Sequence, residues 1–162
     1  MAGYGTDEGF TAYVAAAGYT VPSGANITAA RQRGSVYIDG FYGSRFPGIP
    51  TGGLAQERAW PRTGAVDAYG NVIAPHVIPQ QVVNASYEAA FLEITRPGSL
   101  SLTVDPSRQI KRQKVEGIER EFFEPAARGG FFAPNAPISS IIEGILAPLL
   151  GSAAPLPAIL VV

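Results

Sequence analysis

The sequence predicts a mainly α protein: a small helical bundle with a long irregular loop, one protruding β-hairpin and an extended C-terminal arm. Three observations lead to this fold class. Apolar residues recur at helical spacing in residues 8–17, 25–42 and 79–95, which predicts three core helices. Residues 109–123 form two β-prone runs around Gly117, and this glycine suits a tight hairpin turn. The 14 prolines and 19 glycines cluster in a few loops and in the tail.

Length and composition limit the possible functions. A chain of 162 residues is expected to form one domain, here residues 1–150, followed by an arm at residues 151–162. The formal net charge of −1 argues against a free nucleic-acid binder, and we expect no useful DNA affinity from the protein alone. There is no cysteine, and His76 is the single histidine, so thiolate and histidine-rich metal sites are excluded. No phosphate-binding loop or catalytic triad is present, so neither an enzyme nor a cofactor is expected.

The first two helices have clear boundaries. Thr6 or Asp7 can cap the helix at residues 8–17. In the helix at residues 25–42, the spacing predicts that Arg31, Arg33 and Asp39 point outward. Gly34 and Gly40 either mark a close approach of neighbouring helices or are simply tolerated there.

Residues 43–75 are an irregular region rich in glycine, proline and threonine. Loops this long are usually functional or disordered. Trp60, the only tryptophan, lies within it. We interpret Trp60 as a loop anchor that packs on the core; the alternative is contact with a partner.

The helix at residues 79–95 is predicted to be the central one. Pro79 suits the first helical position, and the Arg96-Pro97 pair ends the helix. Apolar residues cover most of its circumference, so other elements should pack around it. The narrow polar stripe opposite consists of Gln80, Asn84 and Glu88.

The hairpin separates its charges between two limbs. The predicted register places Arg112 opposite Glu121 and Lys114 opposite Glu119. These four residues can pair within the hairpin, form contacts between subunits, or present the basic limb to DNA. Since an isolated hairpin is marginal in water, we expect neighbouring subunits to hold it.

The C-terminal region is almost uncharged. A short helix is predicted near residues 138–147, with an apolar stripe that would be exposed on a monomer. Prolines within residues 144–162 argue against a membrane span and favour an extended arm. The arm either folds back onto the bundle or binds a partner. The predicted partner-binding residues are Ile141, Ile142, Ile145, Leu146, Leu149, Leu156, Ile159, Leu160, Val161 and Val162.

Several motifs resemble a known family. These are AWPRTG at residues 59–64, IPQQVVNASYEAAF at 78–91 and KVEGIEREFF at 114–123. They resemble a tailed-phage family labelled "DnaT-like single-stranded-DNA-binding" and are similar to the head–tail connector proteins of long-tailed phages. The resemblance spans about residues 10–150, and it is most specific at residues 60–64 and 78–79.

The resemblance to connectors implies a structural virion protein, an adaptor or head completion protein. It implies a homo-oligomeric ring, typically about twelvefold, that joins the portal protein to a tail-side stopper or tail terminator protein. DNA would pass through the lumen without sequence specificity, and the C-terminal arm would bind the portal. The implied location is the virion neck, after assembly in the host cytoplasm. The alternative is a single-stranded-DNA-binding protein.

Overall fold

The structure is a computed structural model that describes residues 2–100, 112–115, 118–121 and 139–150. This part of the chain is mainly helical, which confirms the predicted fold class, and the helix ends lie within two residues of those predicted. In chain order, the elements are α1 (Asp7–Ala16), α2 (Ile27–Tyr42), β1 (Ile49–Pro50), η1 (Gly53–Ala55), β2 (Arg62–Thr63), α3 (Gln80–Thr95), β3 (Arg112–Val115), β4 (Ile118–Glu121), α4 (Ser140–Leu146) and η3 (Ala147–Leu149).

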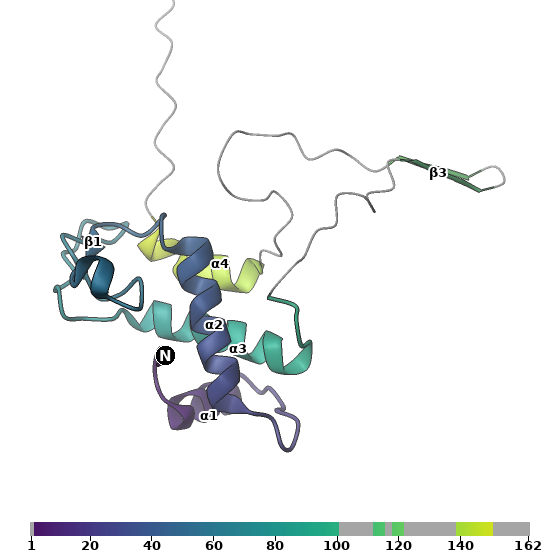
Figure 1. Ribbon diagram of the computed structural model, residues 1–162, viewed down its shortest axis with the longest axis horizontal. Helices are drawn as coiled ribbons and strands as arrows, with labels where there is room; N and C mark the ends of the chain where they lie inside the picture. Colours follow the sequence, from purple (N-terminus) through teal and green to yellow (C-terminus); the bar gives the residue numbers. More distant parts are fainter. Residues whose placement is uncertain (1, 101–111, 116–117, 122–138, 151–162) are drawn as a thin grey trace, which may run out of the picture.

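Helices α2 and α3 cross at the centre of the body, with α1 at one end and α4 at the other (Figure 1). A β-carbon added at Gly34 would lie 2.6 Å from the carbonyl oxygen of Ser86 and 2.8 Å from the amide nitrogen of Ala90. Gly34 therefore marks a close approach of α2 to α3. Gly40 has open space around it, so the same explanation does not apply there.

The central helix α3 buries more of its surface than its sequence predicts. Val82, Ala85 and Ala89 are fully buried, as expected for a central helix. Glu88, predicted to lie on the polar stripe, is instead 4% exposed. Its Oε1 atom accepts hydrogen bonds from the hydroxyls of Tyr13 at 2.9 Å and Tyr19 at 3.0 Å, which replace the water that the carboxylate loses.

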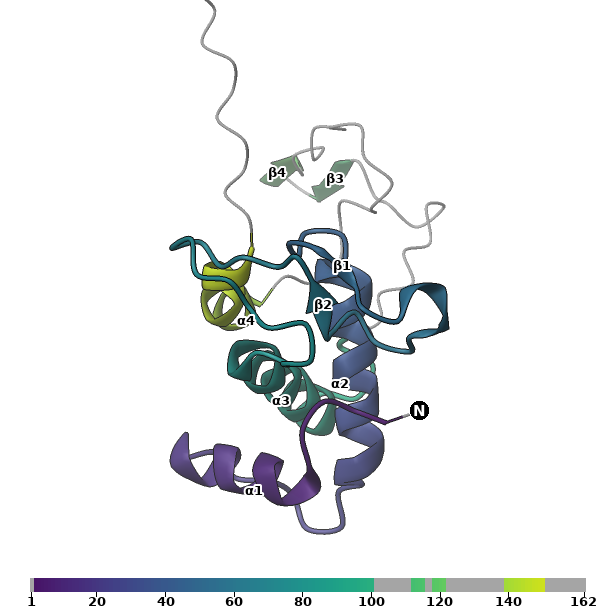
Figure 2. The same cartoon turned by 90° about the vertical axis from the view of Figure 1, so that its left-hand side faces the viewer.

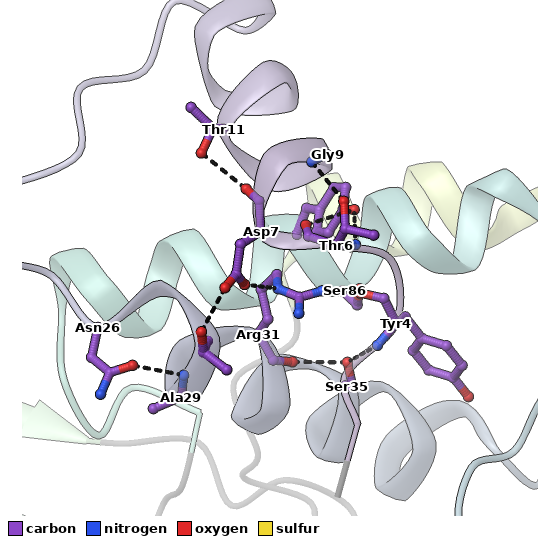
Figure 3. Close-up of polar contacts among 12 residues, drawn as sticks. Tyr4, Thr6, Asp7, Gly9, Thr11, Asn26, Ala29, Arg31, Ser35 and Ser86 are labelled. Atoms are coloured by element: carbon purple, nitrogen blue, oxygen red, sulfur yellow. Dashed lines mark hydrogen bonds and ion pairs between the residues drawn. The ribbon is translucent and has the colours of Figure 1, made fainter.

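The N-terminal segment joins α1 to α2 through polar contacts (Figure 3). Thr6 caps α1, since its hydroxyl accepts from the amide of Gly9. The prediction that Arg31 points outward is wrong, because this residue is only 7% exposed. Its Nε donates to Oδ1 of Asp7 at 2.6 Å, and its Nη1 donates to the carbonyl of Tyr4 at 3.0 Å. The chain preceding α1 thus covers the side chain that helical spacing assigns to solvent.

Asp39 was also predicted to point outward, and it is half-buried. Its carboxylate accepts hydrogen bonds from the hydroxyl of Tyr4 and from Nη1 of Arg58. Burial raises the pKa of Asp39 above its ordinary value, and these two bonds oppose that rise. The Tyr4 hydroxyl also accepts from the amide of Trp60, so this cluster ties the long loop to α2.

The loop between α2 and α3 is held by buried side chains at the end of the body where α4 lies (Figure 2). Trp60 is 1% exposed and meets the ring of Phe46 edge-on, with 5.6 Å between the ring centroids. Arg62 is 7% exposed. It donates at 2.6–3.3 Å to the backbone carbonyls of Phe46, Pro47, Gly48 and Ala59. A single guanidinium therefore satisfies four carbonyls of an otherwise irregular segment.

Helix α4 packs on the protein's own core. Ile142 and Leu146 are fully buried and Leu149 is 3% exposed, all in the same apolar cluster as Trp60. The predicted exposed stripe is therefore wrong for these three residues, because α4 packs on α3 and, with η3, completes an apolar cluster that also contains residues of α2. Ile141 is 52% exposed. The arm at residues 151–162 lies outside the described residues.

Strands β3 and β4 pair in antiparallel fashion in the predicted register. Arg112 lies opposite Glu121, and Lys114 lies opposite Glu119. The opposition of unlike charges along the hairpin is thus confirmed at the level of the backbone. Pairing within the hairpin, a contact between subunits and presentation of the basic limb to DNA all stay predictions.

Candidate functional site

Two neighbouring hollows lie between α2, the C-terminal end of α3 and the first residues of α4. They measure about 320 and 390 Å³ and share Tyr37 and Leu100. We call the two together the arginine groove. The first hollow is lined by Tyr37, Leu92, Arg96, Ser99, Leu100, Ser139, Ser140 and Ile141. The second is lined by Ala29, Gln32, Arg33, Val36, Tyr37, Glu93 and Leu100.

Arg33 enters the groove from α2 beside a buried carboxylate. Its Nε lies 2.9 Å from Oε1 of Glu93, and its side chain is 55% exposed while that of Glu93 is 8% exposed. The second oxygen of Glu93 accepts from the amide of Gly98 at 3.1 Å. Glu93 thus has a partner on each oxygen, while much of the Arg33 side chain still faces solvent.

Arg96 enters the groove from the end of α3. Its backbone is fixed, because its amide donates to the carbonyl of Leu92 and its carbonyl accepts from the amide of Ser99. Its side chain is exposed and makes no ion pair or hydrogen bond with the residues that the structure describes. Among the described residues, no carboxylate or carbonyl competes with an anion for this guanidinium.

The floor of the groove is aromatic and apolar. Tyr37, 6% exposed, lies between the two hollows, and its ring centroid is 4.7 Å from that of Phe41. Burial, and after it the charge of Glu143, raises the pKa of the Tyr37 hydroxyl, so it stays protonated at neutral pH. The groove therefore combines cationic walls with a neutral floor.

The other arginines of the described helical body are committed to structural contacts. Arg31 binds Asp7, Arg45 binds Glu143 at 2.8 Å, and Arg58 binds Asp39 at 3.3 Å. Arg62 binds backbone carbonyls. Among the arginines of residues 2–100, Arg96 is thus the one whose side chain makes no ion pair or hydrogen bond within the described chain. Nowhere among the described residues do three His, Asp or Glu side chains gather in a way that could hold a metal ion.

The sequence-predicted site residues do not converge on this groove, apart from Ile141 at its edge. Trp60 is buried within the loop between α2 and α3. Ile142, Leu146 and Leu149 lie in the core, and Ile145 is half-buried against it. Leu156, Ile159, Leu160, Val161 and Val162 lie outside the described residues. Sequence reasoning assigned Arg33 only to an outer helix face and Arg96 only to a helix end. No local signal could join them, because they lie 63 positions apart in the chain.

Three comparisons relate the chain to known proteins. Neither the curated proteins nor the solved structures returned a match. No helix of the described segments combines the length and the apolar character needed to span a bilayer. A family model described as "Putative DnaT-like ssDNA binding protein" matches residues 3–160.

This match corrects the connector interpretation of the motifs. The description of the family names single-stranded-DNA binding, and nothing in the comparisons points to a head–tail connector, so the virion, connector and portal-binding assignments are wrong. Assembly into a homo-oligomer stays a prediction. Motif resemblance identified shared residues but did not identify what those residues do. Since the match covers 158 of the 162 residues, the chain belongs to the family of putative DnaT-like ssDNA-binding proteins.

Proposed function

We propose that this protein binds single-stranded DNA through the arginine groove. The observation that carries the proposal is the family match over residues 3–160, whose description names single-stranded DNA. The proposed function is binding alone, with no catalytic step and no cofactor.

The groove supplies hydrogen-bond donors for a sugar–phosphate backbone. Phosphate oxygens accept strong, charge-assisted bonds from guanidinium groups such as those of Arg33 and Arg96. The hydroxyls of Ser99 and Ser140 and the amide of Gln32 line the same hollows and can donate to phosphate or sugar oxygens. Contacts of this kind carry no base information, so we expect binding without sequence specificity.

The formal net charge of −1 is compatible with this function. Net charge averages over the chain, whereas an incoming phosphate responds to the charges nearest to it. Only two arginines face the groove, so the electrostatic part of binding should be modest. Two phosphate contacts predict that log K falls with log salt with a slope of about −1.4 on a single strand.

Fluorescence anisotropy of a fluorescein-labelled oligothymidylate, titrated with the protein at several salt concentrations, tests this proposal. We expect saturable binding with about that slope, and weaker binding of a duplex of equal length. Arg96→Gln should lower the magnitude of the slope by about 0.7, since one phosphate contact is lost. The matched control is Arg58→Gln, which removes the same charge from an arginine of the loop between α2 and α3 that pairs with Asp39 and lines neither hollow.

Two results would contradict the proposal. One is the absence of salt-dependent binding by the wild-type protein. The other is an equal loss of affinity in the Arg96→Gln and Arg58→Gln variants, which would indicate a general effect of charge instead of a site.

A second variant tests the groove by a gain of binding. Glu93→Gln removes the charge that neutralises Arg33 but keeps an oxygen for the amide of Gly98. If Arg33 contacts phosphate, the variant should bind the oligothymidylate more tightly and with a steeper salt dependence. An unchanged affinity and slope would limit Arg33 to a structural role.

A further inference from the structure

Tyr69 differs from every other aromatic residue in the described part of the chain. It is 79% exposed, whereas the remaining aromatic side chains of residues 2–100 are buried or half-buried. Val66 and Val72 of the same turn are 40% and 80% exposed. An exposed aromatic side chain loses the benefit of burial, so its position requires a reason other than packing.

The turn that carries Tyr69 is held in one conformation. Oδ1 of Asp67 accepts from the amides of Tyr69 at 2.9 Å and Asn71 at 2.8 Å, and its Oδ2 accepts from the Asn71 side chain at 3.0 Å. These bonds, led by the one from the Asn71 side chain, lower the pKa of Asp67 below its usual value. An isolated β-bridge between Val66 and Val72 closes the turn. The binding of a ligand to Tyr69 therefore carries little entropic cost for ordering the backbone of this turn.

The turn is attached to the same helix that borders the arginine groove. The amide of Ala68 donates to the carbonyl of Pro148 at 2.8 Å, in the 3-10 turn after α4, and Figure 2 shows this loop beside α4. The groove is bordered by Ser140 at the other end of α4. Ser140 and Pro148 are eight positions apart, which corresponds to about 12 Å along a helix at about 1.5 Å per residue.

The path along α4 carries no uncompensated acid. Its exposed positions are uncharged residues, namely Ser140, Ile141, Gly144 and Ala147. Its one charged residue, Glu143, pairs with Arg45 through both carboxylate oxygens, at 2.8 and 3.2 Å. A polyanion that leaves the groove along α4 therefore meets a neutral helix and then the turn of Tyr69. The one acid of this turn, Asp67, has both carboxylate oxygens bonded by Tyr69 and Asn71.

We propose that Tyr69 is a stacking site for one base of the single strand whose backbone binds in the arginine groove. The inference rests on the proposed function and adds the residue that engages a base. Stacking on an aromatic ring accepts any base, because every base has a π face. It thus agrees with a groove that reads phosphates and not sequence.

Substitution of Tyr69 tests the stacking site directly. Tyr69→Ala should weaken oligothymidylate binding between about fivefold and a hundredfold, the usual effect of removing a stacked aromatic. Tyr69→Phe should bind within about twofold of the wild-type protein, since the ring carries the contact. Val72→Ala is the matched control, because it removes an equally exposed apolar side chain from the same turn without removing a ring.

A backbone-only probe separates base stacking from phosphate binding. The wild-type protein and Tyr69→Ala should bind an abasic oligonucleotide of the same length equally well, because no base is present to stack. In Tyr69→Trp, the emission of the exposed indole should be quenched by the oligothymidylate and not by the abasic strand. The emission of buried Trp60 is subtracted with the wild-type protein.

The outcomes distinguish this inference from the proposed function. If the wild-type protein binds with the expected salt slope and Tyr69→Ala binds equally well, the stacking site is refuted and the groove stands. An equal loss in Tyr69→Ala and Val72→Ala would also refute it, and would indicate an apolar contact, such as one with a protein. If the wild-type protein does not bind at all, the proposed function itself fails.

Discussion

Arg62 and Arg96 are the same residue type used in opposite ways. In the loop between α2 and α3, Arg62 is buried and donates to four backbone carbonyls. At the end of α3, Arg96 is exposed and makes no polar side-chain contact with the described residues. The difference shows that an arginine stabilises a fold when the chain uses its donors, and can serve a ligand when the chain leaves them free.

The strongest test of the anchored region is the loss of Trp60. Trp60→Ala should lower the free energy of unfolding by about 3–5 kcal/mol, since a large buried ring leaves a cavity against Phe46. Thermal unfolding followed by circular dichroism measures the effect. Tyr69→Ala is the control, because it removes an exposed aromatic side chain and should leave the melting temperature unchanged. Similar melting temperatures for the wild-type protein and Trp60→Ala would show that Trp60 does not anchor the loop.

The second test removes the donors of Arg62 but keeps its length. Arg62→Met leaves several loop carbonyls without a partner and should cost about 1–3 kcal/mol. Urea denaturation of this variant is compared with that of Arg45→Met, whose arginine is half-exposed and pairs with Glu143. If Arg62→Met were no less stable than Arg45→Met, water would be replacing the lost bonds, and the proposed distinction from Arg96 would fail.

A smaller, pH-dependent effect is expected at Asp7, the partner of buried Arg31. Hydrogen bonds from Thr28 and then Arg31 hold the pKa of Asp7 below its ordinary value. Asp7 therefore binds a proton less readily in the folded state than in the unfolded chain. The stability that the ionised carboxylate contributes is present above about pH 4 and is lost as the pH falls further. The difference in melting temperature between the wild-type protein and Asp7→Asn should shrink from pH 7 to pH 3. A constant difference would mean that the ionised carboxylate is not responsible.

The smallest effect on stability is expected in the groove itself. Arg96→Gln should change the free energy of unfolding by less than about 0.5 kcal/mol, because the side chain is exposed and unpaired among the described residues. The same variant should bind single-stranded DNA more weakly, so the substitution should reduce binding and leave stability almost unchanged. A clear loss of stability in Arg96→Gln would show that Arg96 is structural, like Arg62.

Local patterns in the sequence determined much of this protein. Helical spacing and end signals determined α1, α2, α3 and α4 to within two residues, because both act over a few neighbouring positions. The register of β3 and β4 followed from a two-residue turn, which allows only one pairing of the strands that flank it. These features depend on contacts between residues close in the chain.

Only the tertiary structure decided which polar residues are buried and which remain free. Helical spacing assigned Arg31 and Glu88 to outer faces of their helices. The N-terminal segment covers Arg31, and two tyrosines from outside α3 donate hydrogen bonds to the buried carboxylate of Glu88. In the same way, the apolar stripe of α4 is buried because it packs on the core. The crossing of α2 and α3 places Arg33 and Arg96 in the two adjoining hollows of the arginine groove. The physical reason is that periodicity reports the composition of a helix face, whereas burial depends on which distant segment packs against it.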